Sequence, residues 1–119
     1  MKIASVTENK KNEKRVAITP EIAKKYIASG FEVSISENYG VHLGFDDKKY
    51  SQEGVSIYKD VSQVINNADI IVQLGLISDD LSINIKENQT LIGVFNPYSN
   101  KEKIDLLTQR KINVFSLEL

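Results

Sequence analysis

The sequence contains no cysteine and only one histidine, His42. Without cysteine the chain cannot form a disulfide framework, a thiolate metal site or a thiol nucleophile. His42 lies in a predicted loop, where a surface position is the simpler interpretation. Ser–His catalysis and histidine-rich metal sites therefore have little basis. We expect no metal site and no catalytic residue within these 119 residues.

The chain also lacks an excess of one charge and a long apolar run. Its formal net charge is −1, which argues against the electrostatic footprint of a nucleic-acid-binding protein. The longest apolar run, Ile70–Ile77, is broken by Gln73 and is far too short to cross a bilayer. The opening residues MKIASVTENKK contain no apolar core of a signal peptide. These features predict a soluble domain with no direct membrane span.

Glycine-rich phosphate loops are missing as well. No GxGxxG motif follows a predicted strand, and no Walker loop is present. Gly40 and Gly44 lie in the loop Asn38–Phe45 and are interpreted as turn residues. The carboxylate pairs Asp46-Asp47 and Asp79-Asp80 lie at helix starts, where caps are commoner than metal ligands. We expect no cofactor-binding residue in this chain.

Short apolar stretches alternate with capped helical segments along the sequence. The predicted strands are Lys2–Thr7, Phe31–Ser36, Val55–Tyr58, Ala68–Leu74, Thr90–Phe95 and Ile112–Leu117. The predicted helices are Pro20–Ser29, a short one that Asp46 caps, one that Asp60 caps, and Lys101–Arg110, which Ser99 or Asn100 caps. The segment Gly75–Lys86 is less regular. This alternation predicts one α/β domain with an open, mainly parallel sheet and flanking helices.

The stretch NEKRVAITPEIAKKYIASG is the most informative part of the chain. Thr19 can cap a helix, Pro20 suits its first position, and Gly30 suits its end. Arg15 is thereby placed on a loop between a strand and a helix, where open α/β sheets bind ligands. The alternative is that Arg15 is a solvated charge beside Glu13 and Lys14.

Two further polar residues lie near predicted strand ends. Gln73 interrupts a buried strand, so it marks either a ligand-facing strand end or a pairing with loop backbone. Asn96 follows the strand Thr90–Phe95 at its carboxyl end. Arg15, Gln73 and Asn96 are therefore our candidates for the wall of a cleft.

The sequence KIASVTENKKNEKRVAITPEIAKKYIASGFEV resembles the opening of the alanine dehydrogenase and NAD(P) transhydrogenase family, with its R-V-A-x-T-P motif. GFDDKKYSQEGVSI and ADIIVQLGLIS resemble the next two blocks, so the likeness covers essentially the whole chain. The resemblance implies a Rossmann-like fold similar to the catalytic domain of formate and glycerate dehydrogenases. It also implies that residues 1–119 are the N-terminal part of a longer protein, whose NAD-binding Rossmann domain is absent here.

Two positions favour the transhydrogenase alpha subunit, its NAD(H)-binding component. Alanine dehydrogenases carry a lysine where we align Gly75 and a histidine where we align Asn96. Glycine cannot pair with a substrate carboxylate, and asparagine cannot act as a general acid. The ending FNPYSNKEKIDLLTQRKINVFSLEL also looks like the transhydrogenase subunit.

The resemblance implies hydride transfer between NAD(H) and NADP(H), coupled to proton translocation in the full complex. The expected partners are the remaining transhydrogenase domains and subunits, with a homodimer at full length. The location is cytoplasmic, peripheral to the inner membrane through partner subunits. The fragment alone is expected to be inactive and to bind no cofactor. The alternatives are an amino-acid dehydrogenase of the alanine or saccharopine type and a non-enzymatic α/β binding module.

Overall fold

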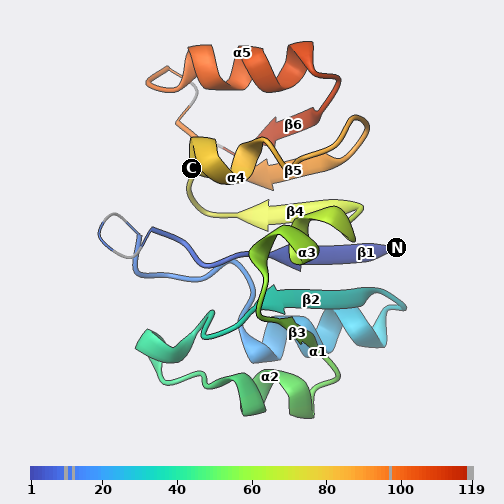
Figure 1. Cartoon of the computed structure of the whole chain (residues 1–119). Coiled ribbons are helices and arrows are strands. Elements are labelled where there is room, and N and C mark those ends of the chain that lie inside the picture. Colours follow the sequence, from blue (N-terminus) through green and yellow to red (C-terminus); the bar gives the residue numbers. More distant parts are fainter. Residues whose placement is uncertain (10, 12, 97, 118–119) are drawn as a thin grey trace.

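The computed structural model describes residues 1–9, 11, 13–96 and 98–117. The strands in this part of the chain are β1 (Lys2–Ser5), β2 (Glu32–Ser36), β3 (Ser56–Tyr58), β4 (Ile70–Gln73), β5 (Thr90–Gly93) and β6 (Asn113–Ser116). They form one open sheet in the order β3-β2-β1-β4-β5-β6, and each neighbouring pair is parallel (Figure 1). This arrangement confirms the predicted α/β sheet.

Helices connect the strands. Their bounds are α1 (Pro20–Ala28), α2 (Asp47–Gln52), α3 (Val61–Asn66), α4 (Asp79–Ser82) and α5 (Lys101–Gln109). As the sequence predicts, the side chains of Thr19, Asp46 and Asp60 accept hydrogen bonds from first-turn amides at 3.0–3.2 Å. These caps satisfy amides that the helix itself leaves without a partner. Gly30, with φ of +96°, ends the turn after α1.

Two local predictions differ from the structure. Asn100 holds the cap position of α5, but its side chain makes no capping bond. The side-chain Nδ2 of Asn100 donates instead to the backbone carbonyl oxygen of Phe95 at 2.6 Å. This bond connects the start of α5 to the segment that follows β5. The predicted loop Asn38–Phe45 contains a short 3-10 helix, η1 (Val41–Leu43), and a bridge between Gly40 and Phe45.

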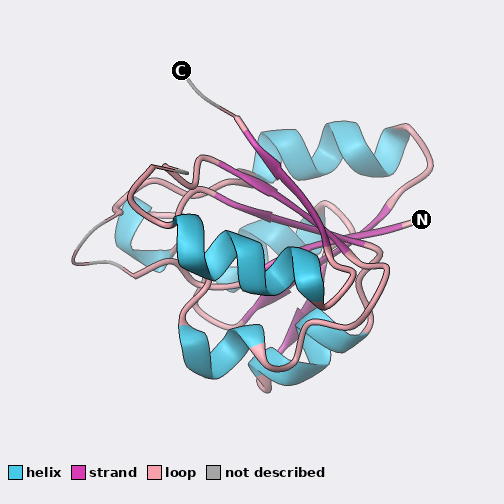
Figure 2. Ribbon diagram, turned by 90° about the horizontal axis from the view of Figure 1, so that it is seen from above, coloured by secondary structure: helices cyan, strands magenta, loops and turns pink. Residues whose placement is uncertain are grey.

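The helices lie on both sides of the sheet and enclose two apolar cores (Figure 2). One core includes buried side chains of α1, α2 and β2, with Tyr39 and Tyr50 at its centre. The other includes buried side chains of α3, α5, β4 and β5, with Phe95 among the largest. Because both faces of β1 and β4 are occupied in this way, these central strands are nearly continuous apolar runs in the sequence.

The strand order changes direction between β1 and β4. From β1 the chain moves outward to β2 and β3, whereas from β4 it moves outward to β5 and β6. The loops that leave β1 and β4 therefore diverge at the carboxyl edge of the sheet. Such a switch point is where open parallel sheets form ligand-binding crevices.

Candidate functional site

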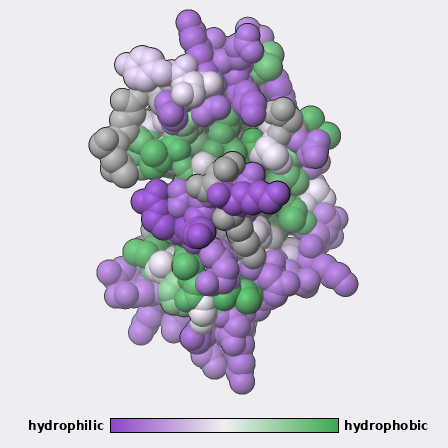
Figure 3. Space-filling model, turned by 90° about the vertical axis from the view of Figure 1, so that its left-hand side faces the viewer, coloured by the Kyte–Doolittle hydropathy of each residue, from purple (hydrophilic) through white to green (hydrophobic). Residues whose placement is uncertain are grey.

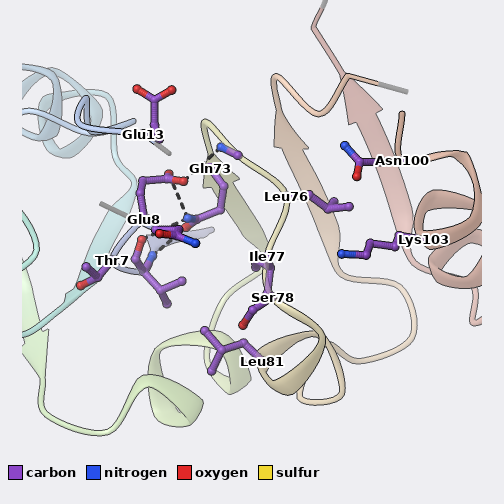
Figure 4. Close-up of a pocket in the computed structure, with 13 residues that line it drawn as sticks. Thr7, Glu8, Glu13, Gln73, Leu76, Ile77, Ser78, Leu81, Asn100 and Lys103 are labelled. Atoms are coloured by element: carbon purple, nitrogen blue, oxygen red, sulfur yellow. Dashed lines mark hydrogen bonds between the residues drawn. The ribbon is translucent and has the colours of Figure 1, made fainter. Parts of the chain in front are cut away.

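A cleft of about 590 Å³ lies at this switch point. Its described lining comes from four places: the loop after β1, the loop after β4, the helix α4 and the start of α5 (Figure 4). Seen from the carboxyl edge, hydrophilic side chains gather across the middle of the molecule, with hydrophobic ones above and below (Figure 3). The described lining of the cleft is mixed: polar and charged side chains come mainly from the loop after β1, and the apolar side chains Leu76, Ile77 and Leu81 from the loop after β4 and from α4.

Glu8 supplies the most unusual group in the cleft, a carboxylate that is only 8% exposed. Its Oε2 accepts hydrogen bonds from the backbone amide of Leu74 at 2.8 Å and from Nε2 of Gln73 at 3.0 Å. Its Oε1 accepts from the backbone amide of Gly75 at 3.0 Å. Burial raises the pKa of Glu8, while the two amide bonds act in the opposite direction.

Gln73 connects Glu8 to the end of β1. Its Nε2 also donates to the carbonyl oxygen of Val6 at 3.0 Å, and its Oε1 accepts from the amide of Val6 at 2.7 Å. The hydroxyl of Ser5 donates to the same Oε1 at 2.9 Å. Of the two roles considered for Gln73, the structure shows pairing with backbone, namely with Val6 after β1. Gln73 also lines the cleft.

Tyr39 extends this network to the loop before α1. Its hydroxyl accepts hydrogen bonds from the amides of Ala17 and Ile18, both at 3.1 Å. Because Ser5 donates its hydroxyl hydrogen to Gln73, the 2.8 Å contact between Tyr39 and Ser5 must be donated by the tyrosine. The hydroxyl thus donates once and accepts twice, and burial raises the pKa of Tyr39 to about 12.

The structure brings only part of the predicted wall together. Arg15 is not among the described lining residues: its guanidinium pairs with Glu13 at 2.8 Å, and Glu13 lines the cleft. Asn96 is not among them either, although its carbonyl oxygen accepts a 3.1 Å bond from the amide of Asn100, a lining residue. Gln73 is therefore the one predicted wall residue that lies in the described cleft lining.

Sequence reasoning missed Glu8, although a usable signal was present. Glu8 follows the first buried strand at its carboxyl end, which is the same position that singled out Asn96 after the strand Thr90–Phe95. Applied to every strand, that rule would have named Glu8. In contrast, no local pattern marks Tyr39, because its partners lie 21, 22 and 34 residues away.

Within the described residues, no group of three or more His, Asp or Glu side chains could hold a metal ion. None of the described helices has the length and apolar character needed to cross a membrane. The described lining of the cleft offers carboxylates, amides, hydroxyls and one amine. The charged side chains among its described lining are Glu8, Glu13 and, on the opposite wall, Lys103 (Figure 4).

Comparison with known proteins places this geometry in a family. The chain is 34% identical over 122 residues to the first part of the NAD(P) transhydrogenase subunit alpha of Rickettsia prowazekii (strain Madrid E), covering 99% of this chain and 32% of that protein. Its fold is that of an L-alanine dehydrogenase (TM-score 0.90, 20% identity, 98% of this chain and 32% of that one).

The fold is also that of a transhydrogenase from Sinorhizobium meliloti (TM-score 0.86, 24% identity, 96% of this chain and 34% of that one). The chain thus spans about a third of the length of the relatives it matches. Residues 5–119 match the family model described as alanine dehydrogenase/PNT, N-terminal domain, and the chain belongs to that family.

Proposed function

We propose that this chain is the N-terminal domain of an NAD(P) transhydrogenase alpha subunit and forms one wall of its nucleotide cleft. The whole protein would transfer hydride between NAD(H) and NADP(H), coupled to proton translocation by membrane subunits. Arg15, Gln73 and Asn96 remain our wall candidates, and we add Glu8. The similarity to a transhydrogenase subunit along 99% of the chain supports this assignment.

The sequence similarity carries the proposal, and the residues at two aligned positions favour a transhydrogenase over an amino-acid dehydrogenase. An amino-acid dehydrogenase needs a cation for the substrate carboxylate and a group that exchanges a proton with the reacting carbonyl. Here the described lining of the cleft holds the carboxylates of Glu8 and Glu13, Arg15 is paired with Glu13, and Lys103 is the cation on the opposite wall. Gly75 has no side chain to offer, and the amide of Asn96 does not exchange protons near neutral pH.

The cleft also fits a domain that contributes to a nucleotide site without holding the nucleotide by itself. A dinucleotide needs a glycine-rich turn whose amides meet the pyrophosphate, and the sequence has no GxGxxG motif after a strand. The two successive amides at the end of β4 are bound to Glu8. We therefore assign the nucleotide-binding residues to the rest of the longer protein.

The proposed partners follow from the same reasoning. The relatives are about three times as long as this chain, so the remaining domains and subunits would complete the cleft. We propose a homodimer at full length. We also propose a cytoplasmic location, peripheral to the inner membrane through the partner subunits.

Oxidation of L-alanine separates this proposal from the amino-acid dehydrogenase alternative. The intact parent protein, purified with its partner subunits, is incubated with NAD⁺ and L-alanine, and NADH is followed by absorbance. We expect no turnover above the background without L-alanine, because losing a general acid alone lowers a rate by about 10²–10⁴-fold. Robust alanine oxidation would overturn the proposal and favour the alternative.

Direct binding tests the role of this chain within the whole. Titration of the 119-residue chain with NADH in a calorimeter should give a dissociation constant weaker than about 10 μM, that is, a binding free energy smaller in magnitude than about 7 kcal/mol. A tighter constant would contradict the assignment of nucleotide binding to other domains. Intact parent protein serves as the positive control.

A further inference from the structure

The end of β4 forms an anion-binding site that the chain fills with its own side chain. The amides of Leu74 and Gly75 follow one another and both donate to the carboxylate of Glu8, at 2.8 and 3.0 Å. The side-chain amide of Gln73 adds a third donor at 3.0 Å. Successive backbone amides that donate to the two oxygens of one carboxylate offer a site suited to an anion. The backbone N–H donors favour the ionised form of the carboxylate that they hold, but burial outweighs them and raises the pKa of Glu8.

We propose that Glu8 acts as an internal occupant that excludes small carboxylate ligands, such as acetate or a 2-oxo acid, from the cleft. Glu8 would then be a specificity-determining residue of this site. For its biological role the inference rests on the proposed function, because a wall that rejects carboxylate substrates suits a hydride-transfer cleft. Its test measures carboxylate binding and no turnover, so either proposal can fail without the other.

Occupancy and charge exclude a competing carboxylate in two ways. The donors of Leu74 and Gly75 are already bound, so a second carboxylate would find no partner there. It would also approach a buried like charge, and two carboxylates sharing a site cannot both ionise easily. Glu13 adds a further negative group to the same cleft, although Arg15 is paired with it. The cation Lys103 lies on the opposite wall, away from the amides of Leu74 and Gly75 (Figure 4).

Replacing Glu8 by alanine would expose the backbone amides of Leu74 and Gly75 to the cleft. Gly75 lines the cleft together with Glu8 and Gln73. Gly75 lacks a side chain, and a Cβ built on it meets only Oε1 of Glu8, at 3.5 Å. No side-chain atom of residue 75 would therefore screen the two backbone donors once the carboxylate is gone.

A purely structural role for Glu8 makes a different prediction. The carboxylate joins the loop after β1 to the end of β4, so its loss leaves buried amides without partners and destabilises the fold. If that were its whole role, removing it would weaken the protein without creating affinity for any ligand. The two interpretations therefore differ in one measurable property, the affinity of the variant for a carboxylate. Only the internal-occupant role predicts that removing Glu8 creates such an affinity.

The experiment follows the backbone amide signals of Leu74 and Gly75 by ¹H–¹⁵N NMR of the 119-residue chain. Acetate and pyruvate are titrated at neutral pH against chloride at equal ionic strength, for the wild type, Glu8→Gln and Glu8→Ala. We expect saturable shifts at both amides in Glu8→Ala, smaller ones in Glu8→Gln, and none in the wild type. The affinity of Glu8→Ala should exceed that of the wild type at least about tenfold, equal to ~1.4 kcal/mol.

Glu13→Gln is the matched control. It removes one negative charge from the same cleft but leaves the amides of Leu74 and Gly75 bound to Glu8. We expect no shift at these two amides with Glu13→Gln, even if the freed Arg15 binds acetate elsewhere. Equal gains in Glu13→Gln and Glu8→Ala would overturn the proposal, since general charge removal would then explain both. Unchanged spectra in all variants would also overturn it.

Rescue by ligand keeps the test valid if Glu8→Ala unfolds at the working temperature. A carboxylate that fills the vacated site stabilises the folded state by mass action. At about ten times its dissociation constant, acetate should then raise the melting temperature of Glu8→Ala by about 6 °C relative to chloride. The wild type should not respond. A melting temperature of Glu8→Ala that acetate leaves unchanged would refute the internal-occupant role.

Discussion

Tyr39→Phe tests the buried network that joins the cleft to the loop before α1. The hydroxyl of Tyr39 is fully buried and uses all of its hydrogen-bonding capacity. Phenylalanine keeps the ring and its edge-on contact with Tyr50, whose ring centroid lies 5.8 Å away. The substitution therefore removes polar contacts and leaves the apolar packing nearly unchanged.

The magnitude follows from the groups left without partners. The amides of Ala17 and Ile18 would both lose their acceptor, whereas the hydroxyl of Ser5 would still donate to Gln73. An unsatisfied buried donor costs about 1–3 kcal/mol. Only the bond from Ile18 is fully buried, whereas that from Ala17 is part-buried, so the substitution should lower the free energy of unfolding by about 2 kcal/mol. This is a large share of the total stability expected for a domain of this size.

Urea unfolding followed by circular dichroism measures the loss. Tyr26→Phe is the control, because Tyr26 is half-buried, packs edge-on against Phe31, and its hydroxyl has no hydrogen bond among those described. We expect the control to stay within about 0.5 kcal/mol of the wild type. A loss below about 1 kcal/mol in Tyr39→Phe, or one equal to that of the control, would refute the orphaned-amide argument.

Three further predictions concern stability. Thr19→Ala should lower the free energy of unfolding by about 1 kcal/mol through loss of the bond to Ile22, and an unchanged urea midpoint would exclude the cap. Gly93→Ala should cost about 3 kcal/mol in the same assay, because its Cβ would collide with the carbonyl oxygen of Gln73; wild-type stability would contradict that collision. Burial raises the pKa of Glu8 above its ordinary 4.5, so the ionised form stabilises the fold less than the protonated form does. The unfolding free energy of the wild type minus that of Glu8→Gln should therefore fall as the pH rises above 4.5, and a rise would show that the amide bonds outweigh burial.

The fold could be predicted from the sequence because its signals are local. Apolar runs marked each strand to within a few residues, and Thr19, Asp46 and Asp60 marked three helix starts that the structure confirms. The prediction of helix caps was weakest where one side chain could form either of two local hydrogen bonds. Asn100 could accept from its own helix or donate to the segment after β5, and in the structure its side chain donates to the carbonyl oxygen of Phe95.

The candidate site could be predicted only in part because its contacts are long-range. Glu8 meets the amides of Leu74 and Gly75 only after β1 and β4 pair, across 66 and 67 residues of sequence. Tyr39 lies in the predicted loop Asn38–Phe45, where no sequence pattern indicates burial, yet it is fully buried. Periodicity predicts which strands exist, but strand order alone decides which of their ends meet.

Hydride transfer between the two nucleotides is the most direct test of the central claim. The full-length parent protein, assembled with its partner subunits, is supplied with NADH and an oxidised NADP analogue whose reduction is followed by absorbance. We predict reduction that depends on both nucleotides and no NADH formation from L-alanine in the same preparation. Alanine turnover without reduction of the analogue would contradict the assignment of this chain to a transhydrogenase.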